Sequence, residues 1–322
     1  MRRLVAACIT ATVLTGCGSV GADDPLQVTD TLTAAEPAHA PRAATTPAGN
    51  VRPAPPTTLT TYLPGILATV HERTVSLYDT RDLNRPPRTL ELPGTPATLR
   101  ATPDGHLLAP QPDADLVARI DPATATAEQL RYPGGPLDAT PVPGGLAVAL
   151  RADNTIALPG GARATGFQRP AELLTLNGEV HVLDTLTTSL TPIDITTGDK
   201  QPALRAGTGA TRTTADRYGR VLAVDTRGEE LLAFDTKPLI MKQRYPVPGA
   251  PYGLAYDPAR DLAWITLTAT NELVGYDIAG GEPREVHRMP TVEQPDSVTV
   301  DPDTGRVYVA SATGAGLQVV TP

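Results

Sequence analysis

A turn glycine, replaced once by aspartate, recurs seven times along the chain and constrains the fold more than any other feature. The six steps from Gly65 to Gly305 cover 240 residues, a mean interval of 40. Short apolar runs follow most of the turns, and most units then reach an apolar residue followed by aspartate, as at Tyr78-Asp79. A repeat of this length built only from strands predicts a β-propeller, a ring of four-stranded sheets. The seven turn residues are Gly65, Gly105, Gly144, Gly178, Gly219, Asp261 and Gly305.

We therefore predict an all-β fold, a seven-bladed β-propeller of four-stranded antiparallel blades over residues 57–322, preceded by a disordered tether. In each unit, strand a precedes the turn residue, strand b follows it, strand c ends near the apolar-Asp pair, and strand d is outermost. Val, Leu, Ile and Thr dominate these segments, as half-buried pleated surfaces prefer, and Pro/Gly corners end them. The b strands are expected at 66–70, 106–109, 146–150, 180–183, 221–224, 262–267 and 306–310.

The last unit is one strand short, because it stops at Pro322 after strand c. A missing outer strand would leave an open edge in the ring. We expect the chain ahead of Thr57, near Val51, to supply this strand. Deletion of residues 45–56 should then lower the melting temperature. The third unit is the most irregular, with Leu158-Pro159 in place of the apolar-Asp pair.

The N-terminus resembles a bacterial lipoprotein signal. An arginine pair precedes an apolar stretch over residues 4–14, which is too short to span a bilayer as a mature helix. The stretch ends in Leu-Thr-Gly-Cys17, which resembles a lipobox, the signal for lipidation of the cysteine and cleavage before it. The resemblance implies a signal peptide over 1–16, a lipid on Cys17 and a place on the extracytoplasmic face of the cell membrane. The alternative is an ordinary secretory signal with a chance cysteine.

The composition indicates a tether ahead of the propeller and limits the classes of partner. Residues 17–56 comprise the cysteine to be lipidated and an Ala/Pro/Thr-rich segment, which we interpret as a tether because it has few large apolar residues to bury. The net charge is −8 and no basic stripe is present, which argues against a nucleic-acid partner. Arginine greatly outnumbers lysine, and Ala, Pro, Thr and Gly are abundant, a composition typical of high-GC actinobacteria.

Two segments resemble a known repeat. Residues 295–311, with the run Val307-Tyr308-Val309, are similar to a YVTN-type propeller repeat, and residues 250–277 form a looser copy. The match departs at Ser311, where that family usually has asparagine. The resemblance implies an exported seven-bladed propeller and no single activity, because the fold hosts many functions.

Polar residues that differ from unit to unit stand where the b strands end, with Leu267 as the apolar exception. They should share one face with the d-to-a connections, and such loops surround the channel mouth of a propeller. The alternative is that these positions are polar only because loop ends are solvated. The candidate ligand or partner face comprises His71, Gln111, Arg151, Asp184, Asp225 and Ser311, together with Arg212, Tyr252 and Asp296 and the nearby Arg169.

No catalytic or metal motif accompanies this face. The sequence has no Gly-x-Ser-x-Gly, and its five histidines are scattered, so we predict no catalytic residue, cofactor or metal. We expect a membrane-anchored lipoprotein whose propeller is a binding or scaffolding platform for an envelope protein, a glycan or a small ligand. The alternative is a lactonase-like propeller hydrolase or lyase that uses His71 with nearby acids at the channel mouth.

Overall fold

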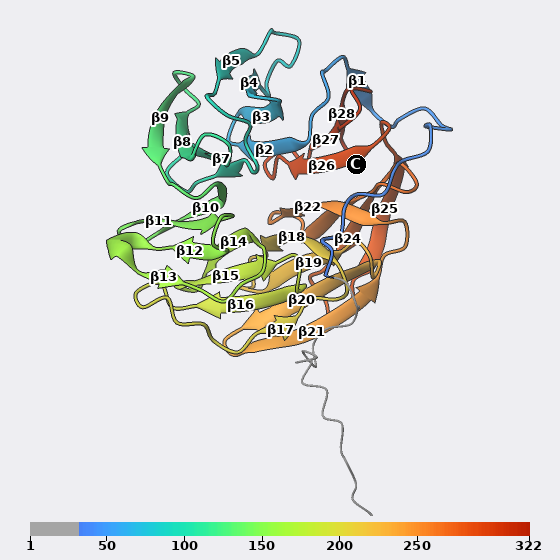
Figure 1. Ribbon diagram of the computed structural model, residues 1–322. Coiled ribbons are helices and arrows are strands. Elements are labelled where there is room, and N and C mark those ends of the chain that lie inside the picture. Colours follow the sequence, from blue (N-terminus) through green and yellow to red (C-terminus); the bar gives the residue numbers. More distant parts are fainter. Residues whose placement is uncertain (1–31) are drawn as a thin grey trace, which may run out of the picture. The chain divides into compact units, whose positions relative to one another are not determined.

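The computed structural model describes residues 32–322, so the predicted signal peptide and Cys17 lie outside the described residues. The described chain forms seven four-stranded antiparallel sheets, arranged as the blades of a propeller (Figure 1). The predicted fold class is therefore confirmed. Neighbouring a strands pack against one another around the centre, and each sheet continues outward through strands b, c and d.

The elements follow the predicted order in every unit. The a strands are β2 (Leu59–Leu63), β6 (Arg100–Ala101), β10 (Pro136–Val142), β14 (Pro170–Leu176), β18 (Ala210–Ala215), β22 (Pro251–Asp257) and β26 (Pro295–Val300). The b strands are β3 (Ile66–His71), β7 (Leu107–Gln111), β11 (Gly145–Leu150), β15 (Glu179–Asp184), β19 (Val221–Asp225), β23 (Leu262–Leu267) and β27 (Val307–Ser311). Each predicted b strand agrees with the structure to within two residues at either end.

The outer strands are shorter and less uniform. The c strands are β4 (Thr74–Asp79), β8 (Leu116–Asp121), β12 (Thr155–Ala157), β16 (Ser189–Ile193), β20 (Glu230–Thr236), β24 (Glu272–Asp277) and β28 (Leu317–Val320). The d strands are β5 (Arg88–Glu91), β9 (Thr126–Arg131), β13 (Arg163–Ala164), β17 (Leu204–Arg205), β21 (Leu239–Pro246), β25 (Arg284–Pro290) and β1 (Asn50–Arg52). In blade 3 a 3-10 turn, η1 (Pro159–Gly161), follows β12, because proline lacks the N–H that a ladder needs.

The hydrophobic core lies between neighbouring blades. Every residue of β23 is buried, because sheets of two adjacent blades cover both of its faces. One cluster joins Leu222 and Val224 of blade 5 to Ala263 and Ile265 of blade 6. Strand β21, at the outer edge, alternates between half-buried and exposed residues, as a strand with one covered face does. Burial therefore decreases from strand b to strand d.

The recurring turn residue has a conformational cause. The six turn glycines have φ between 75° and 86°, in the left-handed region that side chains with a Cβ disfavour. Asp261 adopts the same region with φ 54°, and aspartate is among the few residues that tolerate it. The repeat first seen in the sequence is thus a repeat of backbone conformation.

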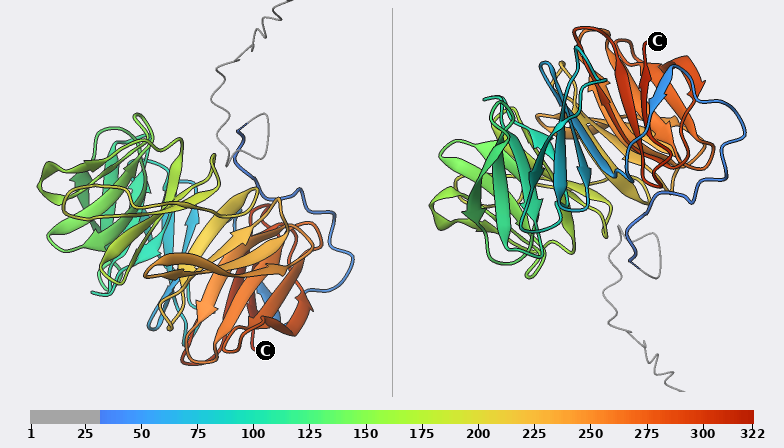
Figure 2. Two further views of the ribbon diagram at one scale, coloured as in Figure 1. Left: turned by 90° about the horizontal axis from the view of Figure 1, so that it is seen from below. Right: turned by 90° about the horizontal axis from the view of Figure 1, so that it is seen from above.

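Strand β1 closes the ring. It pairs antiparallel with β28, with Val51 opposite Gln318, and completes the sheet of β26, β27 and β28. This confirms the expectation that the chain near Val51 supplies the missing strand. Blade 7 therefore combines the first strand of the described chain with its last three strands, and β1 belongs to the 17–56 segment that was interpreted as a tether. Figure 2 shows that the chain ahead of β1 (blue) follows the outside of the C-terminal blades (orange and red).

Candidate functional site

Four members of the predicted ring are buried side chains at the last residue of a b strand. Gln111, Asp184, Asp225 and Ser311 are each at most 1% exposed. Asp184 illustrates their role. One of its oxygens accepts hydrogen bonds from the N–H groups of Gln168 and Arg169, at 2.6 and 3.1 Å, in the d-to-a connection. The other oxygen accepts from Leu186 and Thr187 of the b-to-c turn, at 3.1 and 3.0 Å.

The same contacts recur in other blades. Asp225 accepts the N–H groups of Thr208, at 2.7 Å, and Gly228, at 2.9 Å. Ser311 donates its hydroxyl to the carbonyl of Glu293, at 2.6 Å. Buried backbone N–H and C=O groups need hydrogen-bond partners, and these side chains supply them where two loops meet. The polar residues at the b-strand ends therefore hold the loops of this face in place.

His71 and Arg151 differ from this pattern. The Nδ1 atom of half-buried His71 lies 2.8 Å from the carbonyl oxygen of Pro56, and exposed Arg151 reaches Asp113 at 3.3 Å. Leu150, rather than Arg151, stands opposite Pro136 in the ladder, so Arg151 lies one residue beyond the ring position. The members of the predicted ring consequently do not converge on one cavity.

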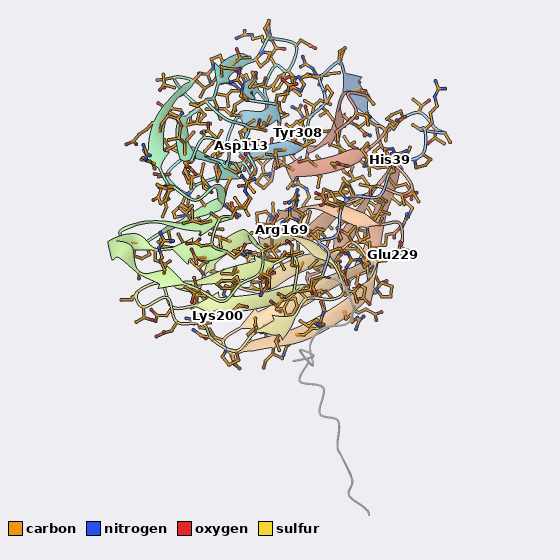
Figure 3. All side chains as sticks on the ribbon, in the orientation of Figure 1. His39, Asp113, Arg169, Lys200, Glu229 and Tyr308 are labelled. Carbon is orange, nitrogen blue, oxygen red and sulfur yellow. The ribbon has the colours of Figure 1, made fainter. Side chains whose placement is uncertain are left out.

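The cavity lies instead along the central channel. It has a volume of about 420 Å³, and its lining comes mainly from the a strands of six blades. Arg212 and Asp296 of the predicted face line it, and so do Arg100 and Glu172, which the sequence did not single out. Figure 3 shows Arg169 near the centre of the ring, and its side chain is exposed.

Most of the charged side chains of the channel wall are paired. Arg100 lies 2.6 Å from Asp138, whose side chain is fully buried, and Arg212 lies 3.1 Å from Glu172. Burial raises the pKa of the Glu172 carboxyl, although the neighbouring Arg212 opposes this shift. Burial disfavours the charged form of Arg212, but its interactions with Tyr252 and Glu172 outweigh burial and raise its pKa.

Three polar side chains on the a strands also join one blade to the next by hydrogen bonds. Strand a has no ladder partner on its channel side, so its N–H groups need other acceptors. Side chains of the preceding blade provide them: Asp138 accepts from Leu173 at 2.7 Å, Glu172 from Thr213 at 2.6 Å, and Ser297 from Thr60 at 2.9 Å. Each acceptor stands two residues after a proline that begins its strand, beside a shift in register. This Pro-x-polar pattern is the signal that could have identified them.

Tyr252 and Asp296 lie beside this paired set. The Arg212 guanidinium carbon is 5.0 Å from the Tyr252 ring centre, and its Nη2 lies 3.3 Å from the phenol oxygen. Gln294 donates to Oδ1 of Asp296 at 2.8 Å, and burial raises the pKa of the Asp296 carboxyl. Within residues 32–322 no side-chain hydrogen bond is seen for the hydroxyls of Thr61, Thr214 and Thr299, which line the same cavity. The channel thus offers hydroxyl groups and one carboxylate to a ligand.

No three His, Cys, Asp or Glu side chains of residues 32–322 come together as a possible metal site. No helix in the same residues is long and apolar enough to cross a membrane.

The fold is shared with solved structures of very different proteins, although no protein-family model and no curated protein matches the chain. A streptogramin B lyase structure is 15% identical over 84% of this chain and 95% of that one, with a TM-score of 0.68. An inactive virginiamycin B lyase from Staphylococcus aureus with quinupristin is 14% identical over 84% and 96%, with a TM-score of 0.66. A chain of a mitotic checkpoint complex is 13% identical over 91% and 98%, with a TM-score of 0.72. At these identities the similarity establishes the seven-bladed propeller fold alone.

Proposed function

We propose that the protein is a membrane-anchored extracytoplasmic lipoprotein, with YVTN-type repeats, whose propeller binds a partner at the cell envelope. The anchor proposal is supported by the signal-like N-terminus ending at Cys17. Replacing the acceptor, Cys17→Ala, should move the protein from the membrane fraction to the medium or to an unprocessed precursor. If the variant is processed and stays on membranes like the parent, the proposed anchor is wrong.

One observation carries the binding role: three of the four charged side chains that line the channel are already paired. Arg100 with Asp138 and Arg212 with Glu172 are fixed by burial and hydrogen bonds, so they shape the channel rather than meet a charged substrate. The groups that remain for a ligand are hydroxyls and one oxygen of Asp296. Such a wall suits a neutral, hydroxyl- or amide-bearing ligand, such as a glycan fragment or a peptide loop.

Thermal unfolding in the presence of soluble cell-wall glycan fragments tests this role. A ligand should raise the melting temperature of the parent, and the double variant Thr214→Val with Thr299→Val should lose that rise, because it removes two channel hydroxyls at constant shape. Thr270→Val, on an exposed turn outside the channel, serves as the matched control. An equal rise in all three proteins would exclude the channel as the binding site.

A lyase or hydrolase is the second candidate, favoured by the similarity of the fold to virginiamycin B and streptogramin B lyases. The catalytic group would be His71, whose Nδ1 faces a backbone carbonyl at the rim and which does not line the channel cavity. Incubation with virginiamycin B, with His71→Ala as the control, distinguishes the candidates. Turnover by the parent that the variant lacks would replace the binding role by an enzymatic one.

A further inference from the structure

The chain ahead of β1 lies across the b-to-c turns of blades 5 and 6. In Figure 1 this segment (blue) passes from the side of β25 toward β18. We call residues 33–41 the strap, and we call Thr268, Asn271 and Gln294 the strap groove. At the start of the strap, Arg227 donates to the carbonyl of Thr33 at 2.9 Å. The strap thus binds the face that carries the b-to-c turns.

Buried side chains of the strap groove bind the backbone of the strap. Gln294 donates from Nε2 to the carbonyl of Ala38, and its Oε1 accepts the N–H of Ala40, both at 2.9 Å. Thr268 accepts the N–H of Ala38 at 3.0 Å, and Asn271 donates to the carbonyl of Pro41 at 2.7 Å. The three groove residues are at most 6% exposed. All four bonds engage main-chain atoms, which is how proteins bind extended peptides.

The propeller itself orients these amides. Oδ1 of Asn271 accepts the N–H of Gln294 at 2.9 Å, which leaves its Nδ2 directed at the strap. Gln294 divides its two Nε2 protons between Ala38 of the strap and Asp296 of the channel wall. One amide therefore connects the strap groove with the channel.

We propose that the strap groove is a recognition site for an extended, Ala/Pro-rich peptide, and that the strap is its resident ligand. Small alanine side chains let the Gln294 amide approach the backbone. Pro37 and Pro41 restrict φ in the free peptide, which lowers the entropy lost on binding. Gln294 also donates a hydrogen bond to Asp296. When the strap fills the groove and fixes the Gln294 amide, it therefore also fixes the Asp296 carboxylate on the channel wall.

A nicked full-length chain tests the proposal without reference to the lipid anchor. A specific protease site is inserted between Ala44 and Thr45, beyond the last strap contact and ahead of β1, and the protein is cut in detergent. The N-terminal fragment should co-elute with the propeller in size-exclusion chromatography. Asn271→Ala with Gln294→Ala should release it about 100-fold faster, as the loss of three hydrogen bonds predicts. Thr270→Ala, an exposed neighbour, should release it at the parent rate.

A competition arm covers the case in which the double variant does not fold. An excess of synthetic peptide 32–45 should displace the fragment from the cut parent. The same peptide with Ala38→Pro and Ala40→Pro should not, because it lacks the two N–H groups that Thr268 and Gln294 bind. Immediate loss of the fragment from the parent, or equal displacement by both peptides, would overturn the proposal.

Discussion

Deleting residues 45–56 removes strand β1 and should destabilise the propeller measurably. The three residues of β1 pair with β28, and Ala48 makes two further hydrogen bonds, one with Pro290 at 3.0 Å and one with Gln318 at 2.8 Å. At about 1 kcal/mol net for each such interaction, reduced by the cost of ordering the segment, the loss is about 3 kcal/mol. A loss of this size lowers Tm by about 5 °C, because the unfolding entropy of a domain of roughly 270 residues is about 0.6 kcal/mol/K.

Scanning calorimetry of the parent, the deletion and a control that lacks residues 18–31 measures this effect. The control removes a similar length of chain outside the described residues and should unfold at the parent temperature. The deletion should also associate at high concentration, because the edge of β28 is left unpaired, and light scattering can follow this. An unchanged Tm in the deletion would refute the conclusion that β1 stabilises the ring.

Three other changes test the buried polar groups. Asp184→Ala should cost about 2 to 4 kcal/mol in urea unfolding, because four loop N–H groups lose their acceptor, whereas exposed Arg151→Ala should cost almost nothing. Arg212→Met should cost about 3 kcal/mol by leaving Glu172 unpaired, and adding Glu172→Gln should restore part of it; no recovery would contradict the ion-pair argument. Burial lowers the pKa of His181, so the unfolded chain binds its proton more readily and stability should fall as pH drops below about 6.5. His181→Gln should show a smaller loss of Tm between pH 7.5 and 5.5 than the parent, and an equal loss would exclude His181 as the cause.

The fold could be predicted because its signals are local. A left-handed turn requires glycine or a tolerated substitute such as Asp261, so the turn conformation leaves a mark in the sequence once per blade. The apolar runs of the b strands are equally visible, since both faces of these strands are covered. The last unit contains three strands where the others have four, so the sequence predicted that an earlier segment supplies the fourth. Strand β1 is that segment.

The candidate site could be predicted only in part. Polar residues at the b-strand ends were visible, but a sequence does not show whether an aspartate faces water or backbone N–H groups. Asp184 and Asp225 are buried because the d-to-a connection that leads into their blade folds over them. Arg212 and Asp296 were predicted, whereas Asp138 and Glu172 were not, because a sequence does not show which N–H group of the next blade lies beside an acid inside a strand.

The sequence by itself determined the number of blades, the order of strands within each blade and the segment that closes the ring. The blade number and the strand order depend on neighbours along the chain, through turn conformation and residue alternation, and the closing segment follows from the number of strands in the last unit. Only the tertiary structure decided which polar groups face the channel and that an Ala/Pro-rich segment lies in a groove of buried amides. The channel contacts join residues of neighbouring blades, such as Arg212 and Glu172, and the strap contacts join residues more than 200 positions apart, such as Ala38 and Thr268. These partners become known only when the blades are arranged in a ring.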